Sequence, residues 1–219
     1  YARNMYYEGH EQYKYHLENY GHPSKFGYKD IIPLWKAENF DPDALISLYK
    51  RAGAKYFAAL ATHHDNFDCW DSAYHRWNSV NMGPKKDIVG LWREAALKHG
   101  LRFAVTEHMV RCYNWFITNK GCDKEGPYAG VPYDGNDPAY EDLYFPPHDD
   151  SSIGYPLNPP EWWKLQWYKR VKDLVEKYQP DLIYIDGGIP FDEVGLAMVA
   201  NYYNNSIKWH NGKLESVIT

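Results

Sequence analysis

The sequence predicts an α/β fold built on a parallel sheet, and two observations support this prediction. Along the 219 residues, helix-like segments with recognisable caps alternate with short apolar runs of strand length. Each of the clearest runs ends at polar residues, as is common at the carboxyl edge of a parallel sheet. Strands that alternate with helices of this length favour right-handed crossover connections within one sheet.

The first helix–strand unit begins at Asp41. This acid precedes a proline at the first helical position, and apolar residues then recur at helical spacing until Gly53. The run 55–61 is short and apolar, as a buried parallel strand requires. It ends at the polar residues 62–64, which are Thr-His-His.

Three further units follow, of which the last is weaker. Their helices are expected over 87–100, 159–180 and 192–202, and their strands over 101–105, 182–185 and 215–218. Between the second and third units, residues 121–160 are rich in Gly, Pro, Asp and Tyr and show little periodicity. We expect this segment to form a long excursion over the edge of the sheet, within one domain that spans 1–219.

Composition and charge limit the classes of function. With 29 acidic and 24 basic residues, the formal charge of -5 favours neither nucleic acid nor an anionic membrane surface as a partner. No apolar run reaches the roughly 18 residues that a spanning helix needs. The 3 cysteines lack metal-type spacing, which argues against a disulfide framework or a zinc knuckle. Because the first residue is Tyr rather than Met, we expect a processed or cut N-terminus, so the compartment stays open.

Polar residues gather at one edge of the predicted sheet, because they follow three of its strands. They are His63, His64, Asp65, Glu107, His108 and Asp186. Three kinds of site fit them. The histidines and a carboxylate could hold a divalent metal, although neighbouring side chains on a strand point to opposite faces. A glycosidase would use Asp186 as its carboxylate nucleophile, and a lectin-like surface would bind without chemistry. No Gly-rich phosphate fingerprint follows any strand, which disfavours a nucleotide site.

Several of these residues also have purely structural explanations. A histidine at a strand end is commonly hydrogen-bonded for stability, and Asp186 could serve only as the turn residue before Gly187. Aromatic residues make up 17% of the chain, which suits either sugar stacking or an aromatic core, and this choice applies to Trp70 and Trp77. The acids expected at helix caps or first turns are Asp41, Asp87 and Glu161.

Four blocks of sequence resemble the alpha-L-fucosidases of glycoside hydrolase family 29. They are G-A-K-Y-F-A-A-L-A-T-H-H-D-N-F-D-C-W-D-S, W-N-S-V-N-M-G-P-K-K-D-I-V-G, G-L-R-F-A-V-T-E-H and P-D-L-I-Y-I-D-G. The resemblance implies a (β/α)8 TIM-like barrel, here incomplete with about four βα units. It also implies retaining hydrolysis of terminal alpha-L-fucosyl residues without a cofactor or metal.

The resemblance implies roles for individual residues. Asp186 matches the nucleophile of the family, and His63 and His64 match histidines that hydrogen-bond the fucose hydroxyls. Trp70 falls where the family places an aromatic residue beside the sugar. The implied partner is a fucosylated glycan, and self-association is expected of an incomplete barrel. A periplasmic, secreted or lysosomal location is favoured over a cytoplasmic one.

The chain also departs from the family pattern. Asn66 replaces the usual glycine, which is expected to change the loop backbone or to add a side-chain contact. Many relatives carry Tyr where this chain has Thr106 or Glu107, and Glu107 and His108 are kept as substrate-binding candidates. The strand with the first sugar-binding histidine would precede Tyr1, and the general acid/base would follow Thr219. The alternatives are therefore a non-catalytic carbohydrate-binding barrel fragment and a metal-dependent barrel hydrolase.

Overall fold

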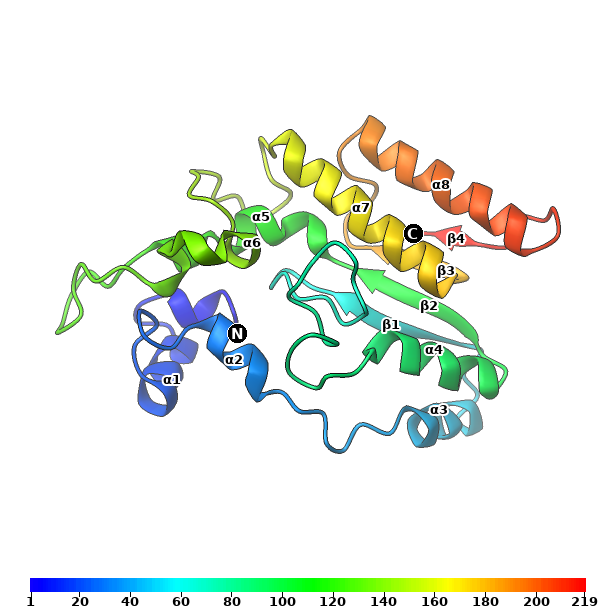
Figure 1. Ribbon diagram of the computed structural model, residues 1–219, viewed down its shortest axis with the longest axis horizontal. Coiled ribbons are helices and arrows are strands. Elements are labelled where there is room, and N and C mark those ends of the chain that lie inside the picture. Colours follow the sequence, from blue (N-terminus) through cyan, green and yellow to red (C-terminus); the bar gives the residue numbers. More distant parts are fainter.

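A four-stranded parallel sheet organises the computed structural model, which describes all residues from 1 to 219 (Figure 1). Its strands pair in chain order and are β1 (Tyr56–Thr62), β2 (Arg102–Glu107), β3 (Leu182–Ile185) and β4 (Val217–Ile218). The helices that alternate with them are α3 (Pro42–Arg51), α4 (Ile88–Lys98), α7 (Glu161–Tyr178) and α8 (Glu193–Trp209). The predicted helix–strand alternation is confirmed, including the weaker fourth unit.

The helix starts follow from local capping. The Asp41 and Asp87 carboxylates each accept a hydrogen bond of 3.0 Å from the backbone N–H three residues later. This satisfies one of the donors that every helix N-terminus leaves free. Glu161 lies in the first turn of α7, where a negative charge suits the helix dipole. The structural roles predicted for these three acids are confirmed.

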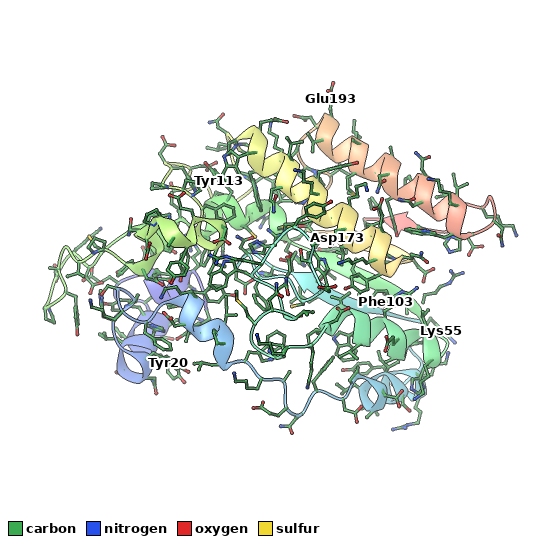
Figure 2. All side chains as sticks on the ribbon, viewed as in Figure 1. Tyr20, Lys55, Phe103, Tyr113, Asp173 and Glu193 are labelled. Carbon is green, nitrogen blue, oxygen red and sulfur yellow. The ribbon has the colours of Figure 1, made fainter.

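Helices cover one face of the sheet and leave the other open. On the covered face, Phe103, Val105, Ile183 and Ile185 are at most 1% exposed and pack against α3, α4, α7 and α8 in one cluster. Figure 2 shows side chains filling this space, with Phe103 labelled. On the open face, the side chains between 41% and 61% exposed are Tyr56, Leu60, Tyr184 and Val217. Successive residues of a strand alternate between these two faces.

A second hydrophobic cluster joins the start of the chain to the segment between β2 and α7. Asp134 accepts hydrogen bonds from the hydroxyls of Tyr6 at 2.8 Å and Tyr144 at 2.7 Å, and all three residues are buried. Within the expected excursion, residues 133–144 therefore pack against the N-terminal segment through Tyr133, Leu143 and Tyr144 and do not form a free loop.

The short helices of the chain lie mainly in these two segments. They are η1 (Asn4–Tyr6), α1 (Glu11–Tyr20), α2 (Tyr28–Ile31), η2 (Ile32–Leu34), η3 (Met109–Arg111), α5 (Cys112–Trp115), η4 (Phe116–Lys120), η5 (Asp134–Asn136), η6 (Pro138–Tyr140) and α6 (Glu141–Tyr144). None of the helices combines the length and the apolar character that crossing a bilayer would demand.

Candidate active site

Four of the predicted edge residues meet at the carboxyl ends of β1, β2 and β3. The ring centroid of His63 lies 4.3 Å from that of His64 and 4.8 Å from that of His108. His108 Nδ1 lies 3.6 Å from Asp186 Oδ2. The register of the parallel strands brings these residues together although they are far apart in sequence.

Asp186 is placed and ionised by its surroundings. It follows β3 directly and precedes Gly187 and Gly188, whose φ angles are 104° and 99°. The Tyr184 hydroxyl lies 3.3 Å from Asp186 Oδ1. Partial burial alone would raise the pKa of Asp186, but the nearby His108 and Arg111 outweigh this effect and lower the pKa. The carboxylate is therefore held in its ionised form near neutral pH.

His64 is held as a neutral donor and acceptor. Its Nδ1 donates to the carbonyl oxygen of His108 at 2.7 Å, and the residue is 7% exposed. Burial lowers the pKa of His64 to about 4, although the hydrogen bond acts in the opposite direction. Since Nδ1 carries the proton, Nε2 is left free to accept a hydrogen bond. His63 is exposed and lines the adjoining cavities.

Two adjoining cavities of about 550 Å³ and 290 Å³ open beside the histidines. Both are lined by Tyr28, Leu60, His63 and Asp65. Asp65 Oδ2 accepts a hydrogen bond of 2.8 Å from the Tyr28 hydroxyl. A larger cavity of about 610 Å³ lies between the loop after β1, α6 and α7, and none of the predicted edge residues lines it. His63 and Asp65 line both smaller cavities and His64 lines the larger of these two, whereas His108 and Asp186 line neither. We therefore assign the site to the sheet edge beside these cavities, where His63 lies next to His108 and His108 lies next to Asp186.

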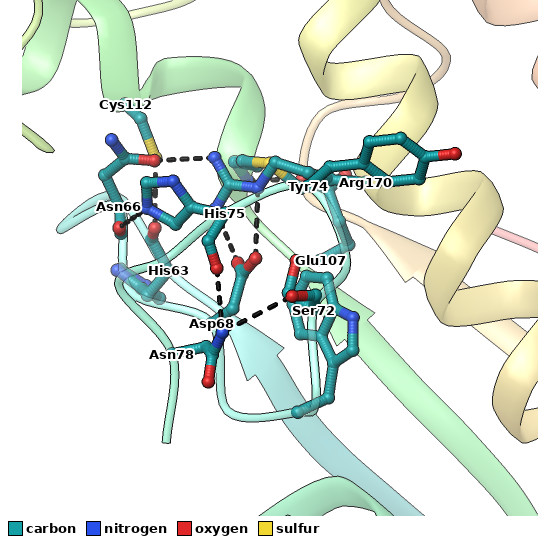
Figure 3. A network of polar contacts seen from close by, with 12 residues as sticks. His63, Asn66, Asp68, Ser72, Tyr74, His75, Asn78, Glu107, Cys112 and Arg170 are labelled. Carbon is teal, nitrogen blue, oxygen red and sulfur yellow. Dashed lines mark hydrogen bonds and ion pairs between the residues drawn. The ribbon is translucent and has the colours of Figure 1, made fainter. Parts of the chain in front are cut away.

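A buried ion pair connects the loop after β1 to α7 (Figure 3). Arg170 of α7 donates from Nε to Asp68 Oδ2 at 3.1 Å, and its Nη1 donates to Asn66 Oδ1 at 2.7 Å. Asp68 and Arg170 are at most 1% exposed. Cys112 Sγ lies 3.1 Å from the carbonyl oxygen of His63, so the backbone of the histidine pair is supported as well.

Comparison with known proteins places this arrangement in a family. The chain matches the family model described as Alpha-L-fucosidase over residues 1–218. The chain belongs to the alpha-L-fucosidase family. Tissue alpha-L-fucosidase of Bos taurus is 30% identical over 171 residues, which are 78% of this chain and 29% of that protein.

Solved structures of alpha-fucosidases share the fold. Thermotoga maritima alpha-fucosidase in complex with a mechanism-based inhibitor has a TM-score of 0.70 at 27% identity, covering 99% of this chain and 43% of that one. An alpha-L-fucosynthase of the same organism, with glycine in place of one aspartate, has a TM-score of 0.66 at 28% identity, covering 99% and 42%. The chain spans between 29% and 32% of the length of the tissue alpha-L-fucosidases that it matches.

The structure corrects two of the predicted substrate contacts in this family member. Trp70 is completely buried, and its indole N–H donates to Asp173 Oδ2 at 3.1 Å, so it belongs to the core. Glu107 is also completely buried because it shares the covered face of β2 with Phe103 and Val105. In this structure neither side chain can touch a sugar.

The structure shows what Asn66 does at the position where the family usually has glycine. Its φ of 58° lies in the left-handed region, which asparagine tolerates better than most residues. Its Nδ2 donates to the carbonyl oxygen of Leu143 at 2.9 Å, in addition to the bond from Arg170. The loop therefore keeps a backbone that glycine could also adopt, and it gains side-chain contacts.

Several site residues were missed by sequence reasoning. Tyr184 stands two residues before Asp186, and the period of a strand could have placed it on the open face. Arg111 and Tyr155 carry no comparable sequence signal, because Arg111 lies in the short helix η3 and Tyr155 in an irregular segment. No group of three or more His, Cys, Asp or Glu side chains is arranged to hold a metal ion.

Proposed function

We propose that this chain is the nucleophile-bearing part of a retaining alpha-L-fucosidase. The observation that carries the proposal is the meeting of Asp186 with His63, His64 and His108 at one sheet edge, in a chain of this family. The proposed substrate is a glycan with a terminal alpha-L-fucosyl residue. Four parallel βα units with an open inner face support the further proposal that the sheet is part of a (β/α)8 barrel.

In the first step, an Asp186 oxygen forms a bond to the anomeric carbon while the bond from that carbon to the leaving oxygen breaks. The leaving oxygen takes up a proton, and water then cleaves the fucosyl ester and releases fucose. His64, neutral and fixed by its bond to the His108 carbonyl, accepts from a ring hydroxyl. The exposed His63 provides a second contact from the same side.

Neither Glu107 nor Asp150 is suited to donate the proton to the leaving oxygen. The Glu107 oxygens accept hydrogen bonds from the Met109 backbone and the Trp167 indole inside the core. Partial burial acts to raise the pKa of Asp150, but backbone N–H donors, that of Ser152 first among them, outweigh it and lower the pKa. An acid held in its ionised form is a poor donor to a leaving oxygen.

A fluorinated fucosyl probe with an activated leaving group tests the nucleophile. We expect the intact protein that carries this chain to be labelled on a peptide containing Asp186, detected by mass spectrometry. Asp186→Ala should lose both labelling and turnover of an aryl fucoside. The control is Asp192→Asn, because Asp192 is exposed, makes no side-chain capping bond, and has a φ of 48° that asparagine tolerates, and it should keep both.

The alternatives give different results in the same experiment. Labelling of another residue would show that Asp186 is not the nucleophile. Fucose binding without labelling would favour a non-catalytic carbohydrate-binding protein. Loss of turnover on adding a chelator, with recovery on adding a divalent metal, would favour a metal-dependent hydrolase.

A further inference from the structure

Tyr155, in the segment that leads to α7, contacts the backbone of the proposed nucleophile. Its hydroxyl lies 3.0 Å from the carbonyl oxygen of Asp186 and 2.7 Å from that of Gly188. Gly187 lies between these two carbonyls with φ of 104°, and a Cβ added there would meet the Tyr155 hydroxyl at 2.9 Å. The tyrosine therefore packs directly against the turn and requires glycine beneath it.

The turn needs such support because its own contacts are weak. The Asp186 carboxylate has only the Tyr184 hydroxyl at 3.3 Å and His108 Nδ1 at 3.6 Å as close side-chain partners. Two consecutive glycines follow, and glycine has the greatest backbone freedom of any residue. A hydroxyl shared between the carbonyls on either side of Gly187 restricts that freedom.

Tyr155 is itself held in place by contacts that begin at the short helices after β2. Asn114 of α5 is 1% exposed, and its Nδ2 donates to the carbonyl oxygens of Ser152 at 2.7 Å and Gly154 at 2.8 Å. Ser152 Oγ donates to the Tyr155 carbonyl at 2.8 Å. The Arg111 guanidinium lies 5.7 Å from the centroid of the Tyr155 ring, within cation–π range. A continuous set of contacts thus runs from α5 to the Asp186 turn.

We propose that Tyr155 is a positioning residue, whose hydroxyl holds the turn 186–188 so that the Asp186 carboxylate faces the anomeric carbon. This inference rests on the proposed function of Asp186. Tyr155 exchanges no proton and forms no bond with the substrate. Its contribution is to orientation, so its loss should slow formation of the fucosyl ester and leave sugar binding unchanged.

Tyr155→Phe in the intact protein tests this role, because it removes the hydroxyl and keeps the ring. We expect the rate of inactivation by the fluorinated probe, and kcat for an aryl fucoside, to fall by about five- to a hundredfold. KM and the affinity for fucose should stay within about twofold, since the sugar contacts are intact. Ser152→Ala, which removes the bond to the Tyr155 carbonyl and the bond that Ser152 Oγ accepts from Asn114 Nδ2, should lower the same two rates by a smaller factor.

Tyr202→Phe is the matched control. The Tyr202 hydroxyl also donates to a backbone carbonyl, that of Pro180 at 2.8 Å, but at the amino end of β3. We expect this variant to lower the melting temperature and to keep both rates. An equal loss of rate in Tyr202→Phe and Tyr155→Phe would overturn the positioning role, because general destabilisation would then explain both.

The remaining outcomes separate this inference from the proposed function. Wild-type rates in Tyr155→Phe, together with an inactive Asp186→Ala, would overturn the role of Tyr155 and leave the nucleophile standing. Absence of probe labelling at Asp186 in the wild-type protein would overturn both proposals together.

Discussion

At the scale of single residues, the loop after β1 depends on side chains that satisfy two requirements together. Asn66 adopts a left-handed backbone conformation and also contacts Arg170 and the Leu143 carbonyl. His64 is buried beside the cavity and also orients the end of β2 through the His108 carbonyl. Each residue can be tested by a substitution that keeps one of its two roles and removes the other.

Asn66→Gly should destabilise the protein by about 1 to 3 kcal/mol. Glycine accepts the φ of 58°, but the Arg170 Nη1 donor loses its partner inside the protein. Asn66→Ala should cost more, because alanine adds backbone strain at the same φ. Chemical denaturation measures both variants, and a glycine variant as stable as the wild type would mean that the side-chain contacts contribute nothing.

His64 should make the folded state sensitive to acid. Its pKa is about 4 in the folded state, compared with roughly 6.5 in an unfolded chain. Between these values the unfolded state binds a proton that the folded state does not, so the free energy of unfolding falls as the pH is lowered from about 6.5 to 4. The loss attributable to His64 is at most about 3 kcal/mol.

His64→Asn checks this assignment, because asparagine can keep a donor to the His108 carbonyl and does not titrate. The variant should show a shallower fall of unfolding free energy over the same pH window. Glu107 acts in the opposite direction between about 4.5 and 7, since burial raises its pKa to about 7. Glu107 is present in both the wild type and His64→Asn, so the difference between their pH slopes is the contribution of His64. An unchanged slope would assign the acid sensitivity to other groups.

At the scale of elements, α7 connects the sheet to the loop that carries the histidines. Its Arg170 side chain crosses to Asp68 and Asn66, and its Asp173 accepts from the Trp70 indole. These contacts connect the loop after β1 to α7, although the loop is long and contains no helix. Buried charged and polar groups require partners, so the loop and the helix constrain each other.

Arg170→Met should destabilise the protein by about 3 to 5 kcal/mol, because it leaves the Asp68 carboxylate buried without its partner. Asp68→Asn combined with Arg170→Met should cost less than the sum of the two single changes. A double-mutant cycle on unfolding free energies measures this coupling. Simple additivity would contradict the ion pair as the connection between the loop and α7.

At the scale of the whole molecule, the sheet has a covered face and an apolar open face. Tyr56, Leu60, Tyr184 and Val217 lie on the open face and are substantially exposed. The N-terminal segment packs beside the sheet, in the second cluster, and does not cover these residues. The same face also carries the exposed Arg102, but several apolar side chains exposed on one sheet face favour association in water.

Residues 1–219 expressed alone should therefore self-associate, because burying the open face removes apolar surface from water. Size-exclusion chromatography with light scattering at micromolar concentration checks this. Replacing Tyr56 and Val217 together with Lys should shift the protein towards monomer. The matched control replaces Tyr7 and Tyr15, which are equally exposed but lie near the N-terminus. A wild-type chain that is monomeric and monodisperse would contradict the prediction.

Much of the fold could be predicted from the sequence because its determinants are local. The caps at Asp41 and Asp87 and the apolar runs of strand length depend on neighbours a few residues away. The meeting of His63, His108 and Asp186 was predictable too, because the carboxyl ends of parallel strands share an edge. Sequence blocks around these residues also indicated the family, which the family model confirms.

Tertiary structure alone decided which polar and aromatic residues face the site. Phe103 and Val105 share a face of β2 with Glu107, so the alternation of side chains along the strand already indicated that Glu107 is buried. Only the packing of α7 shows that this face is closed, because the Trp167 indole donates to Glu107. Tyr155 reaches Asp186 from an irregular segment 31 residues away, and Tyr6 meets Asp134 across 128 residues. Periodicity and capping report on contacts within one element. Contacts between distant segments depend on how whole elements pack, which no local pattern encodes.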